Sequence, residues 1–331
     1  MMKKILIIRF SSIGDIVLTT PVIRCIKKNI PEAEIHYLTR KPFAAVLKAN
    51  PHIDKLHLLD KDLAAMIQTL KKERFDQIID LHHNVRSARI KWNLNVPAHS
   101  FPKLNIEKWL YVRFKWNRMP SVHIVDRYLE TVKHLHVQND GEGLDYFIPP
   151  EEELPPNALP YPAYIGLVIG AAHATKRLPL QKLQELVKML AVPVVLLGGK
   201  EDRENGAAIA GVAPDRIVNA CGQYSLNQSA SLVRQAQLII THDTGLMHIA
   251  AAFRKPILSV WGNTVPAFGM FPYRPDIISQ DLRLEVQNLA CRPCSKIGFE
   301  KCPKGHFKCM EQQNMQQLAA MAMQLWENKK P

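Results

Sequence analysis

The sequence predicts an α/β fold made of two doubly wound domains. Short apolar runs alternate with stretches of helical spacing along both halves of the chain, a rhythm typical of parallel sheets covered by helices. Between the halves, six prolines fall within fourteen residues around Glu151–Glu153, which indicates a stiff linker. We therefore expect two Rossmann-like domains, residues 1–150 and 151–331, facing a cleft in which ligands bind beyond the carboxyl ends of the strands.

In the first half, the predicted strands are apolar runs, and prolines or charged stretches separate them from the helices. The predicted strands are Lys3–Phe10, Glu34–Thr39 and Phe75–His82. The predicted helices are Ile16–Ile30, Lys41–Ala49 and Lys61–Arg74. Pro31 and Pro51 limit the first two of these helices, because proline cannot continue a helix.

The same rhythm restarts after the proline-rich linker. The predicted strands are Tyr164–Gly170, Val192–Gly199, Ile217–Cys221, Gln237–Thr241 and Pro256–Gly262. The predicted helices are Pro179–Leu190, Asp202–Gly211, Leu226–Ala236, Gly245–Phe253 and Gln313–Trp326. We expect the closing helix, within residues 313–328, to pack back on the N-terminal domain.

Composition places the chain among globular proteins. Of its 331 residues, 47% are hydrophobic and 22% are charged, which excludes a disordered or fibrous chain. No apolar run approaches the ~18 residues of a membrane span. The first apolar run stops at Arg9, short of the ~7–15 residues that a signal sequence needs. We therefore expect the mature protein to begin at Met1 and to reside in the cytoplasm.

The charge of the chain is strongly positive and unevenly placed. The net charge is +13, and residues 1–150 hold 24 Lys and Arg against 15 Asp and Glu, which favours an anionic partner. Between Arg86 and Arg118, basic residues alternate with Trp, Tyr and Phe. This pattern suits an anionic membrane interface, single-stranded nucleic acid held by stacking, or core aromatics beneath a solvated basic face. We favour the membrane.

Four of the six cysteines crowd near the C-terminus: Cys291, Cys294, Cys302 and Cys309. A disulfide framework is not expected in a cytoplasmic chain. The C-x-x-C spacing suits tetrahedral Zn²⁺, although the second pair is more widely spaced than in the usual zinc knuckle. The alternative is a set of reduced, partly buried thiols.

The loop after the first strand carries the first candidate site. Ser11, Ser12, Gly14 and Asp15 lie where a strand gives way to a helix, so backbone amides and the helix dipole favour an anionic ligand. No dinucleotide fingerprint or P-loop motif is present. Asp15 either caps the helix or acts as a general base. Gly14 would let a ligand approach the backbone, and the two serine hydroxyls can donate to it.

Three segments in the second half suggest a phosphate site. Asp243 and Thr244 open a helix that also carries His248, so they serve as caps or converge on a diphosphate. Lys176 follows a strand and would neutralise a phosphate, unless its loop is simply a solvated basic one. Glu201 follows a glycine pair and suits ribose hydroxyls or a helix N-terminus.

Together these segments resemble glycosyltransferase family 9, the bacterial lipopolysaccharide heptosyltransferases. The resemblance rests on Phe10–Asp15, Thr175–Pro179, Leu196–Gly199, Asp243–His248 and Pro256–Thr264. It implies a GT-B fold and an inverting, metal-independent transfer from a nucleotide-sugar, without a cofactor. By this resemblance Asp15 is the catalytic base. The implied donor-binding residues are Lys176, Thr175, Glu201, Asp243, Thr244, Gly245 and His248. The implied acceptor-binding residues are Ser11, Ser12, Gly14 and Arg86.

The family's usual donor is ADP-heptose, and its acceptor is the inner core on lipid A. Because lipid A is polyanionic, we expect peripheral contact with the cytoplasmic face of the inner membrane. We also expect a monomer and no nucleic-acid partner. One departure is Leu178, where the family often has Trp, and it leaves the donor and acceptor details open. Three alternatives remain: transfer of another nucleotide-sugar in cell-surface polysaccharide synthesis, a nucleotide-sugar epimerase that needs no acceptor, and a nucleic-acid-binding protein.

Overall fold

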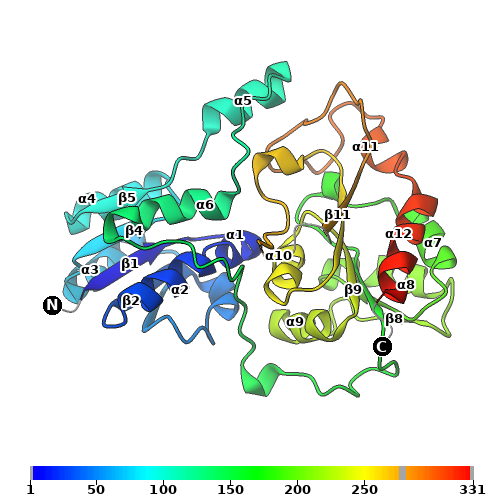
Figure 1. The fold of residues 1–331 in the computed structure, drawn as a ribbon, viewed down its shortest axis with the longest axis horizontal. Coiled ribbons are helices and arrows are strands. Elements are labelled where there is room, and N and C mark those ends of the chain that lie inside the picture. Colours follow the sequence, from blue (N-terminus) through cyan, green and yellow to red (C-terminus); the bar gives the residue numbers. More distant parts are fainter. Residues whose placement is uncertain (1–2, 276–280, 329–331) are drawn as a thin grey trace. The chain divides into compact units, whose positions relative to one another are not determined.

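The structure, a computed structural model, describes residues 3–275 and 281–328 (Figure 1). The chain folds into two compact units. The first unit holds Met1–Lys103 and Val122–Pro149, and the second holds Leu104–Ser121 and Pro150–Pro331. Among the described residues, none of the helices has the length and apolar character needed to cross a bilayer.

The first unit is built on a parallel sheet with the strand order β3-β2-β1-β4-β5. Its strands are β1 (Lys4–Ile8), β2 (Glu34–Arg40), β3 (Lys55–Leu59), β4 (Gln77–Asp80) and β5 (Ala98–Ser100). Its α-helices are α1 (Ile13–Val17), α2 (Thr20–Asn29), α3 (Leu63–Glu73), α4 (Val85–Leu94) and α6 (Ile124–Leu129). Its 3₁₀ helices are η1 (Lys41–Val46) and η2 (Glu130–Leu135).

Helices cover both faces of this sheet. On one face, Leu6 and Leu38 pack with Ile67 of α3 and Ile90 of α4 in one apolar core. Helix α3 connects β3 to β4 in one direction across the sheet, and α2 connects β1 to β2 in the opposite direction. Since such crossovers are right-handed, α2 covers the other face, where α6 packs against it. Parallel strands buried on both faces explain the nearly continuous apolar runs of the sequence.

Two predicted helices of the first unit differ in the structure. The stretch predicted as one helix, Ile16–Ile30, forms the two helices α1 and α2. Pro21 causes the break, because proline lacks the N–H that would continue α1 but fits the first turn of α2. The stretch Lys41–Ala49 forms only the 3₁₀ helix η1.

The second unit is built on a parallel sheet with the strand order β11-β10-β9-β6-β7-β8. Its strands are β6 (Ile165–Val168), β7 (Val194–Leu197), β8 (Ile217–Asn219), β9 (Leu238–His242), β10 (Ile257–Trp261) and β11 (Asp281–Glu285). Its α-helices are α5 (Asn105–Phe114), α7 (Leu180–Met189), α8 (Arg203–Ala210), α9 (Leu226–Gln235), α10 (Gly245–Ala252), α11 (Lys308–Glu311) and α12 (Met315–Glu327). Its 3₁₀ helices are η3 (Pro150–Glu152), η4 (Ala174–Lys176), η5 (Lys200–Asp202) and η6 (Pro266–Phe268).

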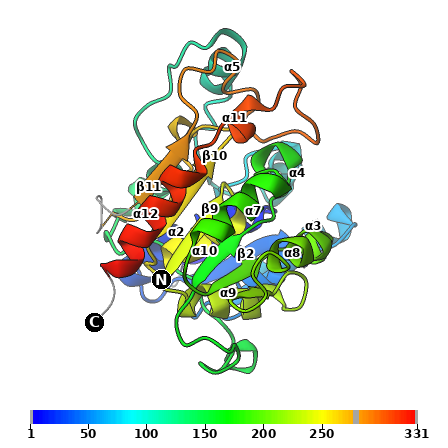
Figure 2. The same ribbon diagram turned by 90° about the vertical axis from the view of Figure 1, so that its right-hand side faces the viewer.

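The closing helix α12 packs within the second unit. It lies beside α7, as Figure 2 shows, and it contacts β9 and β10. Leu318, Ala322 and Trp326 of α12 join the apolar core formed by α7, α8 and this face of the sheet. Our expectation that the closing helix packs back on the N-terminal domain stays a prediction.

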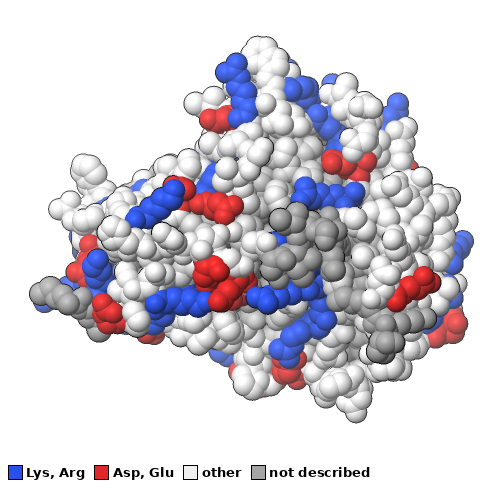
Figure 3. Space-filling view, in the orientation of Figure 1, with Lys and Arg blue, Asp and Glu red and all other residues white. Residues whose placement is uncertain are grey.

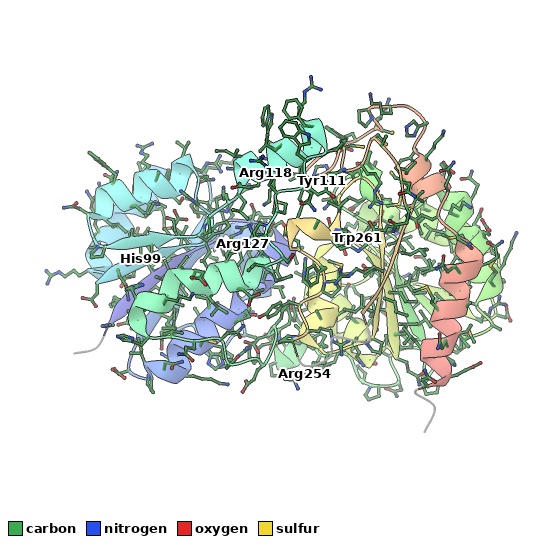
Figure 4. All side chains as sticks on the ribbon, turned by 45° about the horizontal axis from the view of Figure 1, so that its top comes forward. His99, Tyr111, Arg118, Arg127, Arg254 and Trp261 are labelled. Carbon is green, nitrogen blue, oxygen red and sulfur yellow. The ribbon has the colours of Figure 1, made fainter. Side chains whose placement is uncertain are left out.

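The segment Leu104–Ser121 packs with the second unit, although the sequence-based division at residue 150 placed it in the first. Lys115, just after α5, donates from Nζ to the carbonyl oxygens of Cys291 (3.1 Å) and Pro293 (2.7 Å). The ring of Tyr111, labelled in Figure 4, lies 5.9 Å from the ring of Phe268 in η6. These contacts hold α5 against a part of the chain far away in sequence.

Each sheet has one point at which the strand order reverses. In the first unit the chain runs outward from β1 to β2 and β3, then returns to β4 on the other side of β1. In the second unit it runs from β6 to β7 and β8, then returns to β9 on the other side of β6. Ligands of open α/β sheets bind at such points, beyond the carboxyl ends of the strands. The loops after β1, β4, β6 and β9 are therefore the places to look for function.

Candidate active site

The loop after β1 holds Asp15 at the first turn of α1. Its Oδ2 accepts hydrogen bonds from Ser12, 3.1 Å from the backbone nitrogen and 2.7 Å from Oγ. Asp15 thus caps the helix, as the structural interpretation of the sequence proposed. About 20% of its side chain remains exposed to solvent. A capping role and a chemical role are compatible at this position.

Arg9 is the partner of Asp15 that the sequence analysis missed. Its Nη2 lies 2.6 Å from Asp15 Oδ1, and its other nitrogens donate to Ser11 O (2.7 Å), Leu81 O (2.6 Å) and the Tyr128 hydroxyl (3.1 Å). Burial, the largest single influence, lowers the pKa of Arg9, but Asp15, Tyr128 and Tyr37 together raise it by more, so the net shift is upward. This fixed guanidinium holds Asp15 in one orientation. The sequence did contain one indication of this role, because Arg9 is a basic residue that directly follows a buried strand.

The neighbouring loop, after β4, adds a neutral histidine. The ring of His82 packs edge-on against Phe10, with 4.9 Å between centroids. Burial, and then the charge of Arg9, lower the pKa of His82 to about 4. Asp80 orders this loop by accepting from the backbone nitrogens of His82 (3.1 Å) and His83 (2.7 Å). His82 was not among the predicted site residues.

The predicted acceptor residues of the first unit have different surroundings. Gly14 is buried in α1, whereas Ser11 is half-buried and Ser12 is exposed. Arg86 is exposed in the first turn of α4, which follows the β4 loop. Arg86 and Asp15 therefore both lie at the carboxyl edge of this sheet, after its two central strands.

The second unit brings Lys176 and Asp243 together at its own switch point. Lys176 ends η4 in the loop after β6, and Asp243 follows β9. Lys176 Nζ lies 2.6 Å from Asp243 Oδ2, and both side chains are mostly buried. Thr264, which follows β10, donates its hydroxyl to the same carboxylate oxygen at 3.0 Å. Thr264 lies in the segment that carried the family resemblance, but it was not predicted as a site residue.

Asp243 leads directly into α10. Thr244 is the N-cap of this helix, and its hydroxyl oxygen lies 3.4 Å from the backbone nitrogen of Met247, which donates to it. Gly245 is the first residue of the helix, and His248 is buried one turn further on. The first turn of α10 therefore adds its amides and the positive end of its dipole to the charge of Lys176.

Two of the predicted donor residues have other surroundings. The Thr175 hydroxyl is buried and donates to Phe299 O (3.0 Å) while it accepts from Phe299 N (2.8 Å), so it anchors the cysteine-rich segment. Glu201 is exposed on η5. Its neighbour Asp202 is buried, accepts from the Gly199 backbone nitrogen (2.9 Å) and pairs with Arg177 (3.2 Å). Asp202 therefore orders the loops after β6 and β7.

The cysteine-rich segment contains free thiols. Burial raises the pKa of Cys294 to about 12 and that of Cys309 to about 11, so both are protonated near neutral pH. Within the part of the chain that the structure describes, no three of the cysteine sulfur atoms lie within 4.8 Å of one another. This arrangement fits the interpretation as reduced thiols better than a formed four-thiolate site.

The basic and aromatic stretch forms an exposed surface on α5. No residue of α5 is buried, and Trp109 and Trp116 are 57% and 58% exposed. The ring of Phe114 lies 5.3 Å from each of these two indoles. In Figure 3, Lys and Arg side chains flank uncharged ones where Figure 1 draws α5, at the top of the view. The interpretation as core aromatics is therefore wrong for α5, although it holds for Phe101, which is buried.

Comparison with known proteins identifies relatives of this chain. The family model described as glycosyltransferase family 9 (heptosyltransferase) matches residues 63–297. Lipopolysaccharide heptosyltransferase 1 of Campylobacter coli is 27% identical over 293 residues, covering 79% of this chain and 84% of that protein. Lipopolysaccharide heptosyltransferase 2 of Salmonella typhimurium is 25% identical over 304 residues, covering 80% and 84%.

Solved structures share the fold at lower identity. A family 9 glycosyltransferase from Veillonella parvula matches with a TM-score of 0.76 and 22% identity, covering 99% of this chain and 98% of that one. The ADP-heptose lipopolysaccharide heptosyltransferase II of E. coli matches with a TM-score of 0.72 and 19% identity, covering 99% and 100%. With the two parallel sheets, these matches confirm the predicted GT-B fold.

The family match covers well over half of the chain and includes the loops that hold Lys176, Asp243 and Thr264. It confirms the resemblance drawn from the sequence, and it identifies the protein as a glycosyltransferase. The chain belongs to glycosyltransferase family 9, the heptosyltransferase family.

Proposed function

We propose that this protein transfers heptose from ADP-heptose to the inner core of lipopolysaccharide, on a lipid A–Kdo or heptosyl acceptor. Relatives that align with about four fifths of the chain carry the name lipopolysaccharide heptosyltransferase, and a structural neighbour is named for ADP-heptose. The observation that carries the proposal is the Lys176–Asp243 pair beside the N-terminus of α10, at the switch point of the second sheet.

In this proposal, Lys176 and the first turn of α10 bind the donor diphosphate. Transfer breaks the bond between the anomeric carbon and the phosphate oxygen, and negative charge grows on that oxygen. A fixed ammonium group and aligned backbone amides stabilise this charge, so the departure of the diphosphate needs no divalent metal. Asp243 and Thr264 position the ammonium group. The donor site is completed by five further residues: Thr175, Glu201, Thr244, Gly245 and His248.

Asp15 serves as the general base in the same proposal. The acceptor hydroxyl attacks the anomeric carbon from the face opposite the diphosphate, its proton passes to Asp15, and the configuration inverts. Arg9 supports this role because it fixes one carboxylate oxygen of Asp15, and Ser12 fixes the other. Ser11, Gly14 and Arg86 would contact the acceptor. The protein would do this as a monomer.

Nucleotide release in the presence of defined substrates tests the function. Purified protein is mixed with ADP-heptose or a UDP-sugar, with and without a lipid A–Kdo or heptosyl-core acceptor. We expect ADP release only when ADP-heptose and an acceptor are both present, and a product that is one heptose heavier. Turnover of a nucleotide-sugar without an acceptor would instead identify an epimerase. Transfer from a different nucleotide-sugar would correct the donor.

We also propose that α5 places the enzyme on the cytoplasmic face of the inner membrane. Lipid A is an anionic lipid, and basic residues beside Trp favour an anionic bilayer surface. On α5 and directly after it, Lys108, Arg113 and Arg118 accompany the exposed indoles of Trp109 and Trp116. Because Lys115 ties the end of α5 to the cysteine-rich segment, this surface is presented on a fixed part of the second unit.

Vesicle binding tests the membrane proposal. We expect the protein to bind phosphatidylglycerol vesicles, and to bind them less as salt rises. The double variant Trp109→Ala/Trp116→Ala should reduce partitioning by roughly tenfold or more, because a large apolar side chain contributes ~1.5–3 kcal/mol when fully buried. Trp92→Ala is the matched control, since Trp92 is an exposed indole of α4 in the first unit. Equal losses in both variants would contradict the proposal, and salt-sensitive oligonucleotide binding without vesicle binding would favour nucleic acid.

A further inference from the structure

A buried polar cluster lies on two neighbouring strands of the first sheet and at the end of the helix that covers them. His36 is near the start of β2, His57 is in the middle of β3, and Glu73 is the last residue of α3. The two histidines share a face of the sheet with Leu38 and Leu59, two residues further along each strand, and α3 covers this face. The cluster lies on the β2–β3 side of the sheet, whereas the candidate site follows β1 and β4.

The three side chains present ligand atoms at distances that suit one metal ion. His36 Nδ1 lies 2.9 Å from His57 Nε2 and 3.9 Å from Glu73 Oε2, and the three atoms lie within 4.8 Å of one another. Ligands about 2.0–2.2 Å from a tetrahedral Zn²⁺ are separated by roughly 3.3–3.6 Å. The His36–His57 distance of 2.9 Å is shorter than this range, and the His36–Glu73 distance of 3.9 Å is longer. Shifts of several tenths of an ångström would bring both to the separation of tetrahedral ligands.

The surroundings of His36 resemble those of a metal-binding histidine. Its second ring nitrogen, Nε2, lies 2.7 Å from Glu34 Oε1 and donates to it, which leaves the Nδ1 lone pair directed at the cluster. Metal-binding histidines commonly have such a carboxylate on the far nitrogen, which fixes the ring and its tautomer. The ring of Phe75 packs edge-on against His36, with 5.1 Å between centroids, and forms an apolar wall.

Both imidazole rings of the cluster are buried. His36 is fully buried and His57 is 5% exposed. Neutral imidazole is the form that binds zinc. His57 would carry its proton on Nδ1 in the metal-bound state, so that Nε2 faces the ion.

Two lysines oppose a cation here. Lys55 Nζ lies 2.5 Å from Glu73 Oε1, and Lys4 Nζ lies 3.6 Å from Glu73 Oε2 and 3.1 Å from Glu34 Oε1. Lys55 occupies the carboxylate oxygen that faces away from the histidines. Lys4 is the ammonium group that a metal ion would displace, and its partly exposed side chain can swing into solvent.

We propose that His36, His57 and Glu73 bind one Zn²⁺ ion, with Glu34 holding His36 from behind and water in the fourth position. Two imidazoles and one carboxylate form a donor set that zinc accepts. The ion would tie β2, β3 and the end of α3 together and stabilise the first unit. It would take no part in the proposed transfer, because its histidine ligands lie on β2 and β3, whereas the candidate site follows β1 and β4.

Zinc binding by the unaltered full-length chain is the first test. Protein stripped with a chelator is titrated with ZnCl₂ by calorimetry, and the coordination of the bound ion is measured by X-ray absorption. We expect one ion per chain with a nitrogen and oxygen shell at about 2.0–2.2 Å. Absence of binding would overturn the proposal. A shell of sulfur alone at about 2.3 Å would also overturn it, because it would place the zinc on the cysteines.

Variants of the surrounding charges separate a metal site from an ordinary buried hydrogen-bond network. Glu34→Gln should weaken zinc binding 10–100-fold, because it removes the carboxylate behind His36. Lys4→Gln should tighten binding, because it removes a competing positive charge. His57→Gln and Glu73→Gln should abolish binding, and if either fails to fold, the opposite shifts of the first two variants still decide. Equal affinity in all four variants would refute the site.

Two controls complete this experiment. His134→Gln alters another contacting histidine pair, since the rings of His134 and His99 stack at 3.6 Å in the same unit. We expect that variant to bind zinc like the unaltered protein. The double variant Cys291→Ser/Cys294→Ser should also retain the ion. Loss of zinc in the cysteine variant, with retention in His57→Gln, would reject our assignment.

Discussion

Replacement of Asp15 by asparagine is expected to lower kcat by about 10²–10⁴-fold, the usual contribution of a general base. Asparagine keeps the size of the side chain and one carbonyl oxygen, so the contacts with Ser12 that cap α1 can persist. It cannot accept the proton of the acceptor hydroxyl. Donor affinity should remain nearly unchanged, because the proposed diphosphate contacts belong to the second unit. Steady-state turnover and ADP-heptose binding, measured on the same preparation, test both statements.

The Asp15→Asn variant needs a control for the loss of a carboxylate that caps a helix. Asp62→Asn provides it. Asp62 caps α3 by accepting from the backbone nitrogens of Ala64 (2.8 Å) and Ala65 (2.9 Å), in the same unit but outside the candidate site. We expect this control to turn over at the normal rate. Unchanged turnover in Asp15→Asn would show that the carboxylate is a helix cap and not the base.

The central strands were predictable because burial on both faces leaves a direct trace in the sequence. The cores of β1 and β7 are uninterrupted aliphatic runs, as expected for parallel strands covered by helices on both sides. The edge strand β3 was missed because Lys55 and His57 interrupt its run. His57 is nonetheless buried, since it hydrogen-bonds to His36 on the neighbouring strand. No local pattern reveals a partner 21 residues away.

The candidate site was predictable where function follows from local chemistry. The loops with Asp15 and Asp243 were found because polar residues and a glycine directly follow an apolar run and open a helix. Thr264 was missed because its role depends on a hydrogen bond to Asp243, which follows the neighbouring strand β9. The assignment of α5 to the second unit could not be predicted from the sequence either, since the contact between Lys115 and Cys291 joins residues 176 positions apart.

Replacement of Lys176 by methionine is expected to weaken donor binding and turnover together. The proposed diphosphate would lose its cation and would face the carboxylate of Asp243, which Lys176 Nζ now pairs at 2.6 Å. Loss of one group that stabilises a developing charge lowers kcat by ~10²–10³-fold, and the added repulsion should raise the dissociation constant of ADP-heptose. Calorimetry with ADP-heptose and steady-state kinetics measure the two effects. Lys182→Met is the matched control, because Lys182 pairs with Glu185 across one turn of α7, away from Asp243 in the sequence.

A double-mutant cycle distinguishes a donor-binding lysine from one that merely pairs with Asp243. If Lys176 binds the diphosphate and Asp243 positions it, Lys176→Met/Asp243→Asn should recover part of the donor affinity lost in Lys176→Met, since the repelling carboxylate is gone. Turnover should stay low, because no cation meets the leaving diphosphate. If donor affinity is instead untouched in Lys176→Met, the ion pair is only structural. The diphosphate must then be held by the amides of α10 alone.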